Sequence, residues 1–550
     1  MAITKVYLFI AIIMLLMLSP ARYAAAESNA LSASGDLQSI AQGLIDPNFQ
    51  KKSEVIESIA RSNALQALPL LKVLLAGNLY YQPTPLQLVS VVDQQGQPLA
   101  TDMLTGQVLV AYNADAFKKI TVNNRLRGQL RAVIAQLSLR HQDAAVRLNA
   151  VNEMMKNFDG GNEALLRAAL QNEPEARVRE ALAVAVAMVD LNSRDQTRRL
   201  TAITTLGGNV QAEVKTKLLA LIEKRSDGQF VEADERVRLA AESALKRIET
   251  KLSYYSFIEN LFFGLSLGSV LLLAAIGLAI TFGVMGVINM AHGELMMIGA
   301  YTTYVVQLLM PHQIDISIFV AIPAAFLVAA LFGIAIERGV IRYLYGRPLE
   351  TLLATFGISL VLQQLVRTVF SPLNRSVETP SWMSGALEIN SALALTYNRL
   401  YIIGFSLLVF VALLLLLKKT VFGLQMRAVM QNRTMAKAMG VRSGWIDSLT
   451  FGLGSGIAGV AGVALSQLTN VGPNLGQAYI IDSFMVVVFG GVGNLWGTLV
   501  GAFSLGVINK FLEPWAGAVL AKILVLVFII LFIQKRPRGL FPQKGRAAEH

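Results

Sequence analysis

Residues 288–295, INMAHGEL, place three polar side chains inside one of the most apolar parts of the chain. The stretch SLGSVLLLAAIGLAITFGVMGV precedes them and MMIGAYTTYVVQLL follows them. Asn289, His292 and Glu294 would thus lie within about one and a half turns of a helix. A charged side chain deep in a membrane helix costs about 3 kcal/mol on insertion scales, so it is rare unless it faces a polar interior. Whether this segment enters a membrane depends on the rest of the chain.

The composition is that of an integral membrane protein. Of the 550 residues, 54% are hydrophobic and 15% are charged, whereas soluble globular proteins carry more charge. The chain has no Cys, which excludes a disulfide framework and a thiolate metal site or nucleophile. The net charge of +12 could indicate nucleic acid, but basic loops on the cytoplasmic side of a membrane account for it more simply. We therefore expect a lipid bilayer, and no nucleic acid, as the surroundings of this chain.

The first 26 residues resemble a targeting segment. A basic MAITK precedes the apolar VYLFIAIIMLLMLS, and small residues follow at 24–26. This order predicts a secretory signal peptide that is cleaved after Ala26, with an uncleaved first anchor as the alternative. Either way the next segment is exported, so we expect an N-terminal domain in the periplasm of a bacterial inner-membrane protein.

Residues 27–250 form a charged, Ala- and Leu-rich region with four similar segments. AAVRLNAVNEM, ARVREALAVAV, TRRLTAITTL and ERVRLAAESAL each carry an Arg beside apolar residues at helical spacing. Such irregular repeats are typical of an α-solenoid, in which each unit is buried only against its neighbours. The pattern resembles HEAT-type repeats, with an ordinary helical spacer as the alternative. A β-hairpin insert is predicted from 86–93, the turn QQGQ and 107–112. The four matching residues are Arg147, Arg179, Arg199 and Arg238.

The remainder, residues 251–545, is predicted to be a polytopic bundle of membrane helices. Most of its apolar runs are close to the roughly 20 residues that span hydrocarbon. The basic segments 337–348, 418–442 and 534–546 should be cytoplasmic, and the segments 371–399 and 469–478, poorer in Lys and Arg, should lie outside. The runs are 257–281, 287–309, 316–336, 350–370, 400–417, 446–468, 479–511 and 517–534.

Counting these spans shows that 479–511 cannot cross the membrane once. The chain is outside near Asn470, must be outside again near Glu513, and ends inside at its basic C-terminal segment. The run must therefore enter and return as two half-length helices that meet at GGVGNLWG, 490–497. Such a re-entrant break is tolerated only where it lines a protein interior or an aqueous cavity, which is a feature of transporters. The predicted break contains Gly490, Gly491, Gly493 and Gly497.

The longest cytoplasmic loop, 425–449, contains a short amphipathic helix. Small residues at Ala436 and Gly440 would allow the surface of another protein to approach the backbone closely. The basic residues around them, Arg427, Arg433, Lys437 and Arg442, would contact an acidic partner or lipid headgroups. A basic interfacial loop without a partner is the alternative.

Four segments of the membrane region resemble a known family. MRAVMQNRTMAKAMGV (426–441) is similar to the loop by which permeases of ABC transporters contact their ATPase, in its branched-chain amino-acid form. GVMGVINMAHGELMMIGAY, GGVGNLWGTLVGA and KRPRGLFP resemble further signatures of that permease family, in the correct order. The signal peptide and the long exported domain resemble the first membrane subunit of urea ABC transporters, whose permease portion belongs to the same family. The resemblance implies a second permease subunit, two cytoplasmic ATPases and a periplasmic substrate-binding protein. The coupling-loop residues it implies are Arg427, Asn432, Arg433, Ala436, Gly440 and Val441.

The motifs that are missing from the sequence agree with a transport subunit. No GxxxxGK[ST] phosphate loop occurs, so this chain is not expected to bind ATP. HExxH, GxSxG and zinc-type spacings are also missing, so we expect no metal, no cofactor and no catalytic activity. We expect the permease of an ATP-driven importer for a small nitrogen solute, with urea favoured. The predicted spans hold few ionisable residues beyond Glu294, Arg367 and Asp482, which favours a neutral solute. The alternatives are a branched-chain amino-acid permease, a secondary transporter or channel, and a membrane-anchored scaffold.

The polar cluster at 288–295 fits a helix that begins again after a break. Residues 257–310 are long enough for two spans with a break near Gly283–Gly286, so Asn289 would cap the second helix and Glu294 would lie in its first turn. The cluster either contacts the substrate or only stabilises the break. We predict a substrate pathway near Asn289, His292, Glu294, Asn470, Asn474, Gln477 and Asp482.

Overall fold

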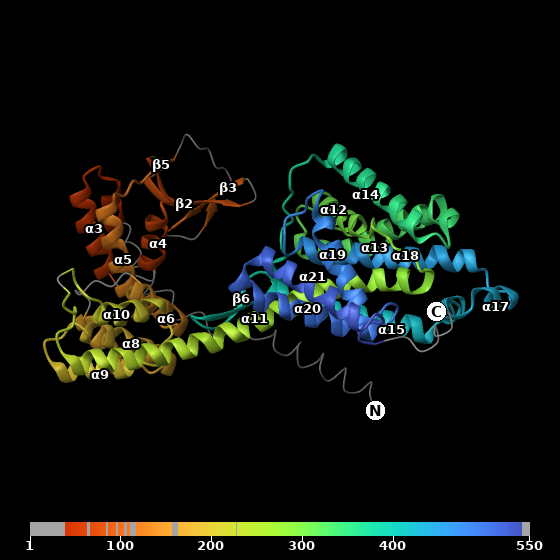
Figure 1. Cartoon of the computed structure of the whole chain (residues 1–550). Helices are drawn as coiled ribbons and strands as arrows, with labels where there is room; N and C mark the ends of the chain where they lie inside the picture. The colour runs from red at the N-terminus through yellow and green to blue at the C-terminus, as the bar shows by residue number, and fades with distance from the viewer. Residues whose placement is uncertain are drawn as a thin grey trace, which may run out of the picture. The chain divides into compact units, whose positions relative to one another are not determined.

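The computed structural model of the chain describes residues 39–541, apart from 63–65, 84–85, 95–96, 104–106, 110–116, 157–162 and 227. The predicted signal peptide lies outside the described residues. The chain divides into two compact units, Met1–Glu249 and Thr250–His550, and Figure 1 labels many of their elements.

The first unit is mostly helical and contains one small sheet. Buried Leu and Ile side chains of its N-terminal helices pack with those of α5 to form one core. Its helices are η1 (Gln42–Ile45), α3 (Phe49–Arg61), α4 (Ala67–Ala76), α5 (Asn124–Ser138), α6 (Ala144–Lys156), α7 (Glu163–Asn172), α8 (Ala176–Asp190), α9 (Gln196–Leu206), α10 (Ala212–Ile222) and the start of α11 (Glu235–Met285).

The predicted hairpin belongs to a larger antiparallel sheet of five strands, in the order β4-β3-β2-β1-β5. The expected pairing of 86–93 with 107–112 is wrong. β2 (Leu86–Gln94) pairs instead with β3 (Gln97–Asp102), with Gln94 opposite Gln97, because a two-residue connection pairs a strand with the segment that follows at once. Pro98 weakens the strand signal of this segment in the sequence. The other strands are β1 (Leu79–Pro83), β4 (Val108–Leu109) and β5 (Lys118–Lys119).

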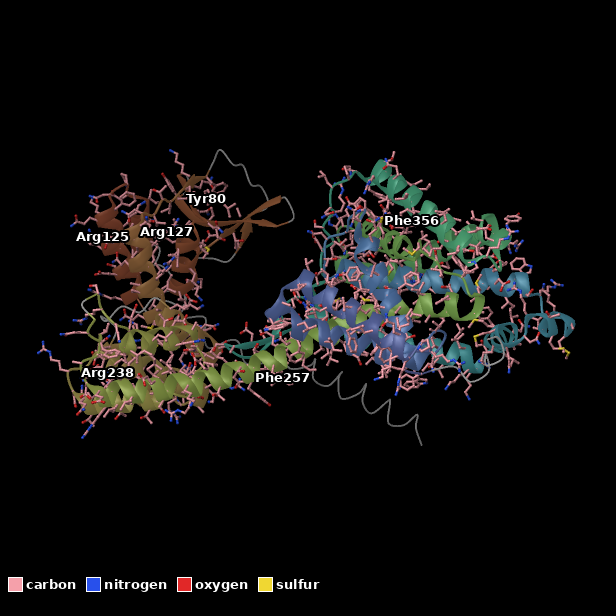
Figure 2. The ribbon with its side chains drawn as sticks, in the orientation of Figure 1. Tyr80, Arg125, Arg127, Arg238, Phe257 and Phe356 are labelled. Atoms are coloured by element: carbon pink, nitrogen blue, oxygen red, sulfur yellow. The ribbon has the colours of Figure 1, made fainter. Side chains whose placement is uncertain are left out.

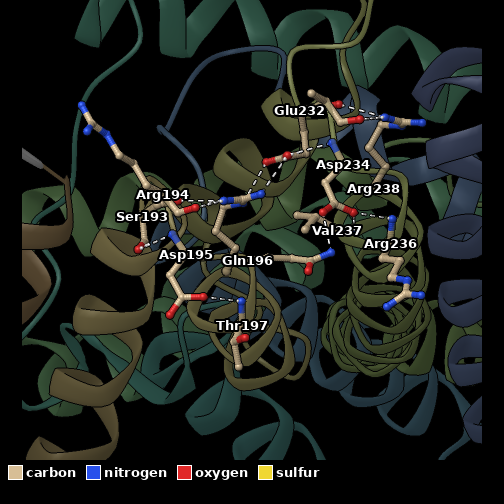
Figure 3. Close-up of polar contacts among 12 residues, drawn as sticks. Ser193, Arg194, Asp195, Gln196, Thr197, Glu232, Asp234, Arg236, Val237 and Arg238 are labelled. Carbon is tan, nitrogen blue, oxygen red and sulfur yellow. Dashed lines mark hydrogen bonds and ion pairs between the residues drawn. The ribbon is translucent and has the colours of Figure 1, made fainter.

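The four matching arginines make the same local contact. Each guanidinium donates hydrogen bonds to the carbonyl oxygens five and six residues before it, and so holds the loop that precedes its helix. Arg199 reaches Ser193 O at 2.9 Å. Arg238 reaches Glu232 O at 3.0 Å, and both of these residues are labelled in Figure 3. Arg147 and Arg179 bond their own preceding loops in the same way. The similar segments of sequence therefore fold into similar helix starts, while a HEAT-type architecture remains a prediction.

Two of these arginines also bond to the loop of the next similar segment. Arg147 Nη2 lies 2.7 Å from Glu173 Oε1, and Arg199 Nε lies 3.2 Å from Glu232 Oε2. The hydrogen bond from Arg147 lowers the pKa of the Glu173 carboxyl group. Ser193 stands at the position equivalent to these two glutamates, so the contact recurs at the first and third junctions and not at the second.

The second unit contains most of the long apolar helices of the chain. Seven of the described helices are long and apolar enough to cross a membrane, namely α11, α13, α14, α15, α18, α20 and α21. The helices that follow α11 are α12 (His292–Leu309), α13 (Ile314–Gly339), η4 (Ile341–Leu344), α14 (Pro348–Phe370), η5 (Ser381–Met383), α15 (Tyr397–Lys419), α16 (Val421–Gln431), α17 (Arg433–Ala438), α18 (Ser443–Ser466), α19 (Leu475–Gly490), α20 (Leu495–Ala516) and α21 (Ala518–Lys535). A short hairpin, β6 (Ala386–Asn390) and β7 (Leu393–Thr396), precedes α15.

Two of these helices form the centre of the unit. In the apolar windows of α11 and α18, 89% of residues are buried, against 17–33% in the other five. The outer helices instead expose large apolar side chains, such as Phe356 on α14 (Figure 2). An apolar surface of this extent is unfavourable in water and suits hydrocarbon. The second unit is therefore a multi-pass membrane bundle with α11 and α18 inside it.

Glycines allow the central helices to approach closely. A side-chain carbon added at Gly454 of α18 would lie 2.7 Å from the carbonyl oxygen of Gly277 on α11. Carbons added at Gly459 and Gly299 would meet the backbones of α13 and α18 in the same way. Small residues at such contacts are what allow helices to associate in a membrane, where no hydrophobic effect drives them together.

The chain turns between α19 and α20 at the expected glycines, but the two helices differ in length. Gly491, at φ +105°, follows the end of α19, in a conformation that favours glycine. With 16 residues α19 is about 24 Å long and falls short of the hydrocarbon thickness. With 22 residues α20 is about 33 Å long and can span it. The expectation of two half-length helices is therefore wrong for α20, because its helical pattern continues through Asn509 and Lys510 to Ala516.

The basic segments lie at one end of the second unit. The guanidinium of Arg433 lies 4.8 Å from the ring centre of Tyr345. This contact brings the loop before α14 next to the loop before α18. The backbone N–H of Phe541 donates to Gly490 O at 3.1 Å, which brings the C-terminal segment to the turn after α19. At the opposite end, Arg375 N donates to Val471 O at 2.7 Å. The connections therefore alternate between two ends, as helices that cross a membrane in turn require.

Candidate functional site

The site begins at the start of α12, where the polar cluster of the sequence is completely buried. Asn289 and His292 have no exposed surface, and Glu294 is 1% exposed. The sequence suggested that Asn289 caps α12, but this prediction is wrong, because the residue at the cap position is Ala291. The Asn289 side chain accepts a hydrogen bond from Ala291 N at 3.0 Å, because Asn readily bonds the backbone two residues ahead of it in a turn.

His292 anchors the start of α12 to α11. Its Nε2 lies 2.9 Å from the carbonyl oxygen of Ala274, so Nε2 carries the proton and Nδ1 is an acceptor. Nδ1 is buried and finds no partner in the described part of the chain. The main structural role of His292 is therefore to hold the start of α12 against α11.

Only one of the two carboxylate oxygens of Glu294 accepts hydrogen bonds. Its Oε1 accepts hydrogen bonds from Ser359 Oγ at 2.9 Å and from Gln363 Nε2 at 2.7 Å. Its Oε2 is buried without a partner among the residues that the structure describes. A buried carboxylate oxygen without a donor is costly, so Glu294 is the strongest candidate in the unit for contact with a bound solute.

A polar stripe on α14 faces Glu294. The stripe consists of residues spaced four apart, and its buried Thr355 also accepts a hydrogen bond from Met290 N at 3.1 Å. Sequence reasoning named only Arg367 from this stripe, although the four-residue spacing in an apolar helix was a readable signal. The members are Thr351, Thr355, Ser359, Gln363 and Arg367.

The start of α19 meets the start of α12. A side-chain carbon added at Gly293 would lie 2.5 Å from the carbonyl oxygen of Gly476, so the two backbones are in direct contact. Next to this contact, Asn474 accepts a hydrogen bond from Arg367 Nη2 at 2.8 Å. Four predicted pathway residues, Asn289, His292, Glu294 and Asn474, thus lie on neighbouring elements. Asn470 and Gln477 are exposed near the same end of α19.

Asp482 does not belong to this cluster. Its Oδ2 lies 3.2 Å from Lys522 Nζ, on α21, and its side chain is mostly buried. The expectation that Asp482 lines the pathway is therefore corrected to an ion pair that ties α19 to α21. Sequence reasoning overlooked Lys522 in the last span, and a pairing between distant helices has no local signal.

The predicted coupling loop forms α16 and α17, but its small residues do not share one exposed face. Ala436 is 5% exposed and packs in the apolar core, so it cannot contact a partner. Gly440 is exposed with φ +85°, and a side-chain carbon added to it would meet no atom within 4 Å. It follows the end of α17, where a left-handed residue commonly ends a helix. The exposed apolar side chains on α17 and after it are instead Met435 and Met439.

The other predicted coupling residues stabilise the loop itself. Arg427 donates to Leu417 O, and the Asn432 side chain caps α17 by accepting from Met435 N at 2.9 Å. Val441 N donates to Ala436 O at 3.0 Å. Arg433 forms an ion pair with the buried Asp447 of α18.

The glycines of the α19–α20 turn serve close packing. A carbon added at Gly490 would lie 2.3 Å from Gly497 O, and one added at Gly283 would lie 2.5 Å from Gly493 Cα. Asn494 caps α20 by accepting from Trp496 N at 3.0 Å. This turn therefore joins α11, α19, α20 and the C-terminal segment at the basic end.

The comparisons with known proteins concern the second unit. Residues 260–533 match the family described as "Branched-chain amino acid transport system / permease component". The high-affinity branched-chain amino acid permease BraD of Pseudomonas aeruginosa is 30% identical over 52% of this chain and 96% of its own length. The corresponding permease LivH of Escherichia coli is 30% identical over 52% of this chain and 95% of its own length. The ribose import permease RbsC of Escherichia coli is 28% identical over 50% of this chain and 84% of its own length. No solved structure matches the chain significantly.

Proposed function

The chain belongs to the branched-chain amino acid permease family of ABC importers, and on that premise we propose that it passes a small amino acid across the inner membrane. Its relatives are named as transport permeases, so the chain is a transport subunit and not an enzyme. The substrate, the path and the partners are our proposals.

The main support for the proposed substrate path is the carboxylate oxygen of Glu294 that has no partner among the described residues. An amino acid presents an ammonium group and a carboxylate. Glu294 Oε2 can accept from the ammonium. The carboxylate is favoured near the positive ends of α12 and α19, whose starts meet at Gly293 and Gly476, and near Arg367. Broken helices whose N-termini point at a substrate are a recurring arrangement in transporters.

Urea is the second candidate. The resemblance of the whole chain favours it, and the Ser359, Gln363 and Asn474 side chains can hydrogen-bond a neutral amide. Ionisable residues are less scarce than the sequence suggested, because the membrane helices also hold Glu337, Asp447 and Lys522. The names of the relatives support amino acids instead.

Uptake by a deletion strain distinguishes the two solutes. We expect loss of the gene to abolish uptake of labelled leucine at micromolar concentration and to leave urea uptake unchanged. Reintroducing the intact gene should restore leucine uptake. Lost urea uptake with intact leucine uptake would assign the chain to urea. Normal uptake of both would contradict the proposal as a whole.

We propose that α16 and α17 are the contact for a cytoplasmic ATPase. Met435 and Met439 are four apart, are 60% and 79% exposed, and lie at the basic end, which the positive-inside tendency places in the cytoplasm. The sequence lacks a phosphate loop, so ATP must be bound by separate subunits. A complete importer would then contain two ATPases, a second permease subunit and a periplasmic binding protein.

The first unit is proposed to be an exported, HEAT-like domain in the periplasm. The orientation follows from the predicted signal peptide and from the basic end of the second unit. Protease added to spheroplasts should remove residues 27–250 and leave 418–445 protected, as antibodies against each region would show. A protected first unit with a cleaved 418–445 would reverse the orientation.

A further inference from the structure

Four polar residues link the proposed coupling helix to the centre of the bundle. Glu337 lies near the end of α13, Tyr345 follows η4, and Asp447 and Ser448 lie near the start of α18. Glu337 and Asp447 have no exposed surface. Arg433, the first residue of α17, reaches this group from the loop.

The contacts form one connected group. Tyr345 Oη donates to Glu337 Oε1 at 3.0 Å, and Ser448 Oγ donates to Glu337 Oε2. Arg433 donates to Asp447 Oδ2, and its guanidinium lies over the ring of Tyr345. Burial raises the pKa of the Tyr345 hydroxyl, so it remains a donor. Arg433 is thus the member of the group that comes from the proposed coupling helix.

Charge makes Arg433 necessary to the group. Asp447 Oδ1 has no partner within the described ranges, so its ion pair with Arg433 is what balances the buried carboxylate. The next basic residue of the loop, Lys437, is exposed, and within the described part of the chain Asp447 forms its ion pair with Arg433 and not with Lys437. Moving α17 away from α18 would therefore leave a buried charge unpaired.

The two helices that receive these contacts, α13 and α18, are closely packed against each other. A carbon added at Gly333 of α13 would lie 2.1 Å from Ser455 Oγ of α18, and one added at Gly459 of α18 would lie 2.5 Å from Ala325 O of α13. α18 also contacts α12, whose start carries Glu294. A displacement of α17 that is passed to Asp447 and Glu337 therefore reaches the proposed substrate site through packed backbones.

We propose that Arg433 is a positioning residue that transmits movement of α17 to α13 and α18 through Asp447, Tyr345 and Glu337. The inference rests on the proposed function, in which α16 and α17 contact the ATPase. Arg433 does not touch the solute. It determines whether a change at the ATPase contact alters the helices around the site.

The test uses the complete importer in proteoliposomes, with ATP hydrolysis and solute uptake measured on the same preparation. For Arg433→Gln we expect the ATPase to remain bound and hydrolysis to persist. The number of solutes carried per ATP should fall by about 5- to 150-fold, the size of a typical coupling between two sites. Arg433→Lys, which keeps the charge, should restore part of this ratio. Lys419→Gln, which removes an exposed charge from the end of α15 in the same basic segment, should leave it unchanged.

A second variant separates coupling from folding. In the double variant Arg433→Gln with Asp447→Asn, the side chain that Arg433 balanced is neutral as well. The thermal stability lost by Arg433→Gln should therefore return while the transport ratio stays low. A normal ratio in either variant would overturn the inference, and so would loss of the bound ATPase in Arg433→Gln, which would place Arg433 in the docking contact. Failure of a Met439→Cys variant to crosslink to the ATPase would instead contradict the proposed function.

Discussion

Glu294→Gln should lower leucine uptake by about 10- to 100-fold, because a hydrogen bond to a charged group contributes about 1.5–3 kcal/mol. The variant keeps an oxygen that can accept from Ser359 and Gln363, so the protein should insert and fold normally. What it removes is the negative charge offered to the ammonium group of an amino acid. Uptake of labelled leucine by membrane vesicles, at equal amounts of inserted protein, measures the effect.

Two further variants make this result specific. Glu378→Gln removes an exposed carboxylate from the segment between α14 and α15 and should leave uptake unchanged. Glu294→Ala removes the acceptor as well as the charge, so its uptake should be lower still. If Glu294→Gln transports leucine as well as the unaltered chain does, the carboxylate does not contact the substrate. A small effect of Gln with a large effect of Ala would favour a neutral solute such as urea.

The positions of the membrane helices could be predicted from the sequence, because the length of an apolar run and the location of basic loops are local properties. The runs 316–336 and 350–370 fall inside α13 and α14. The glycines of 490–497 likewise indicated where α19 gives way to α20. What the sequence did not reveal was that α20 continues far enough to span the membrane.

The roles of single side chains were harder to predict, because they depend on contacts between distant segments. Ala436 looked available to a partner but is covered by this chain's own core. Asp482 looked like a pathway residue, yet its partner Lys522 lies on another helix. Ser359 and Gln363 were not predicted, because uncharged polar side chains are common at contacts between membrane helices and do not by themselves indicate a site. Only the approach of α12 to α14 shows that these two side chains bond Glu294.

The contact between α12 and α18 gives the prediction with the largest effect on stability. A side-chain carbon at Gly299 would lie 2.0 Å from the carbonyl oxygen of Gly459, and one at Gly462 would lie 1.9 Å from that of Met296. Backbone atoms cannot move aside as a flexible side chain can, so both helices would have to separate. Overpacking typically costs about 1–3 kcal/mol and sometimes more. We therefore expect Gly299→Ala and Gly462→Ala each to lower the thermal midpoint of the protein in detergent substantially.

The matched control is the same substitution where the chain leaves space. Gly404 lies inside α15, and a carbon added to it would have no atom within 4 Å apart from the adjoining backbone of its own helix. Because Ala favours a helix over Gly by about 1 kcal/mol, Gly404→Ala should unfold at the same temperature as the unaltered chain or slightly above it. The four Trp residues allow unfolding to be followed by fluorescence without a label. Equal midpoints for Gly299→Ala and Gly404→Ala would show that α12 and α18 are not in backbone contact, and the path from Arg433 to Glu294 would lose its last step.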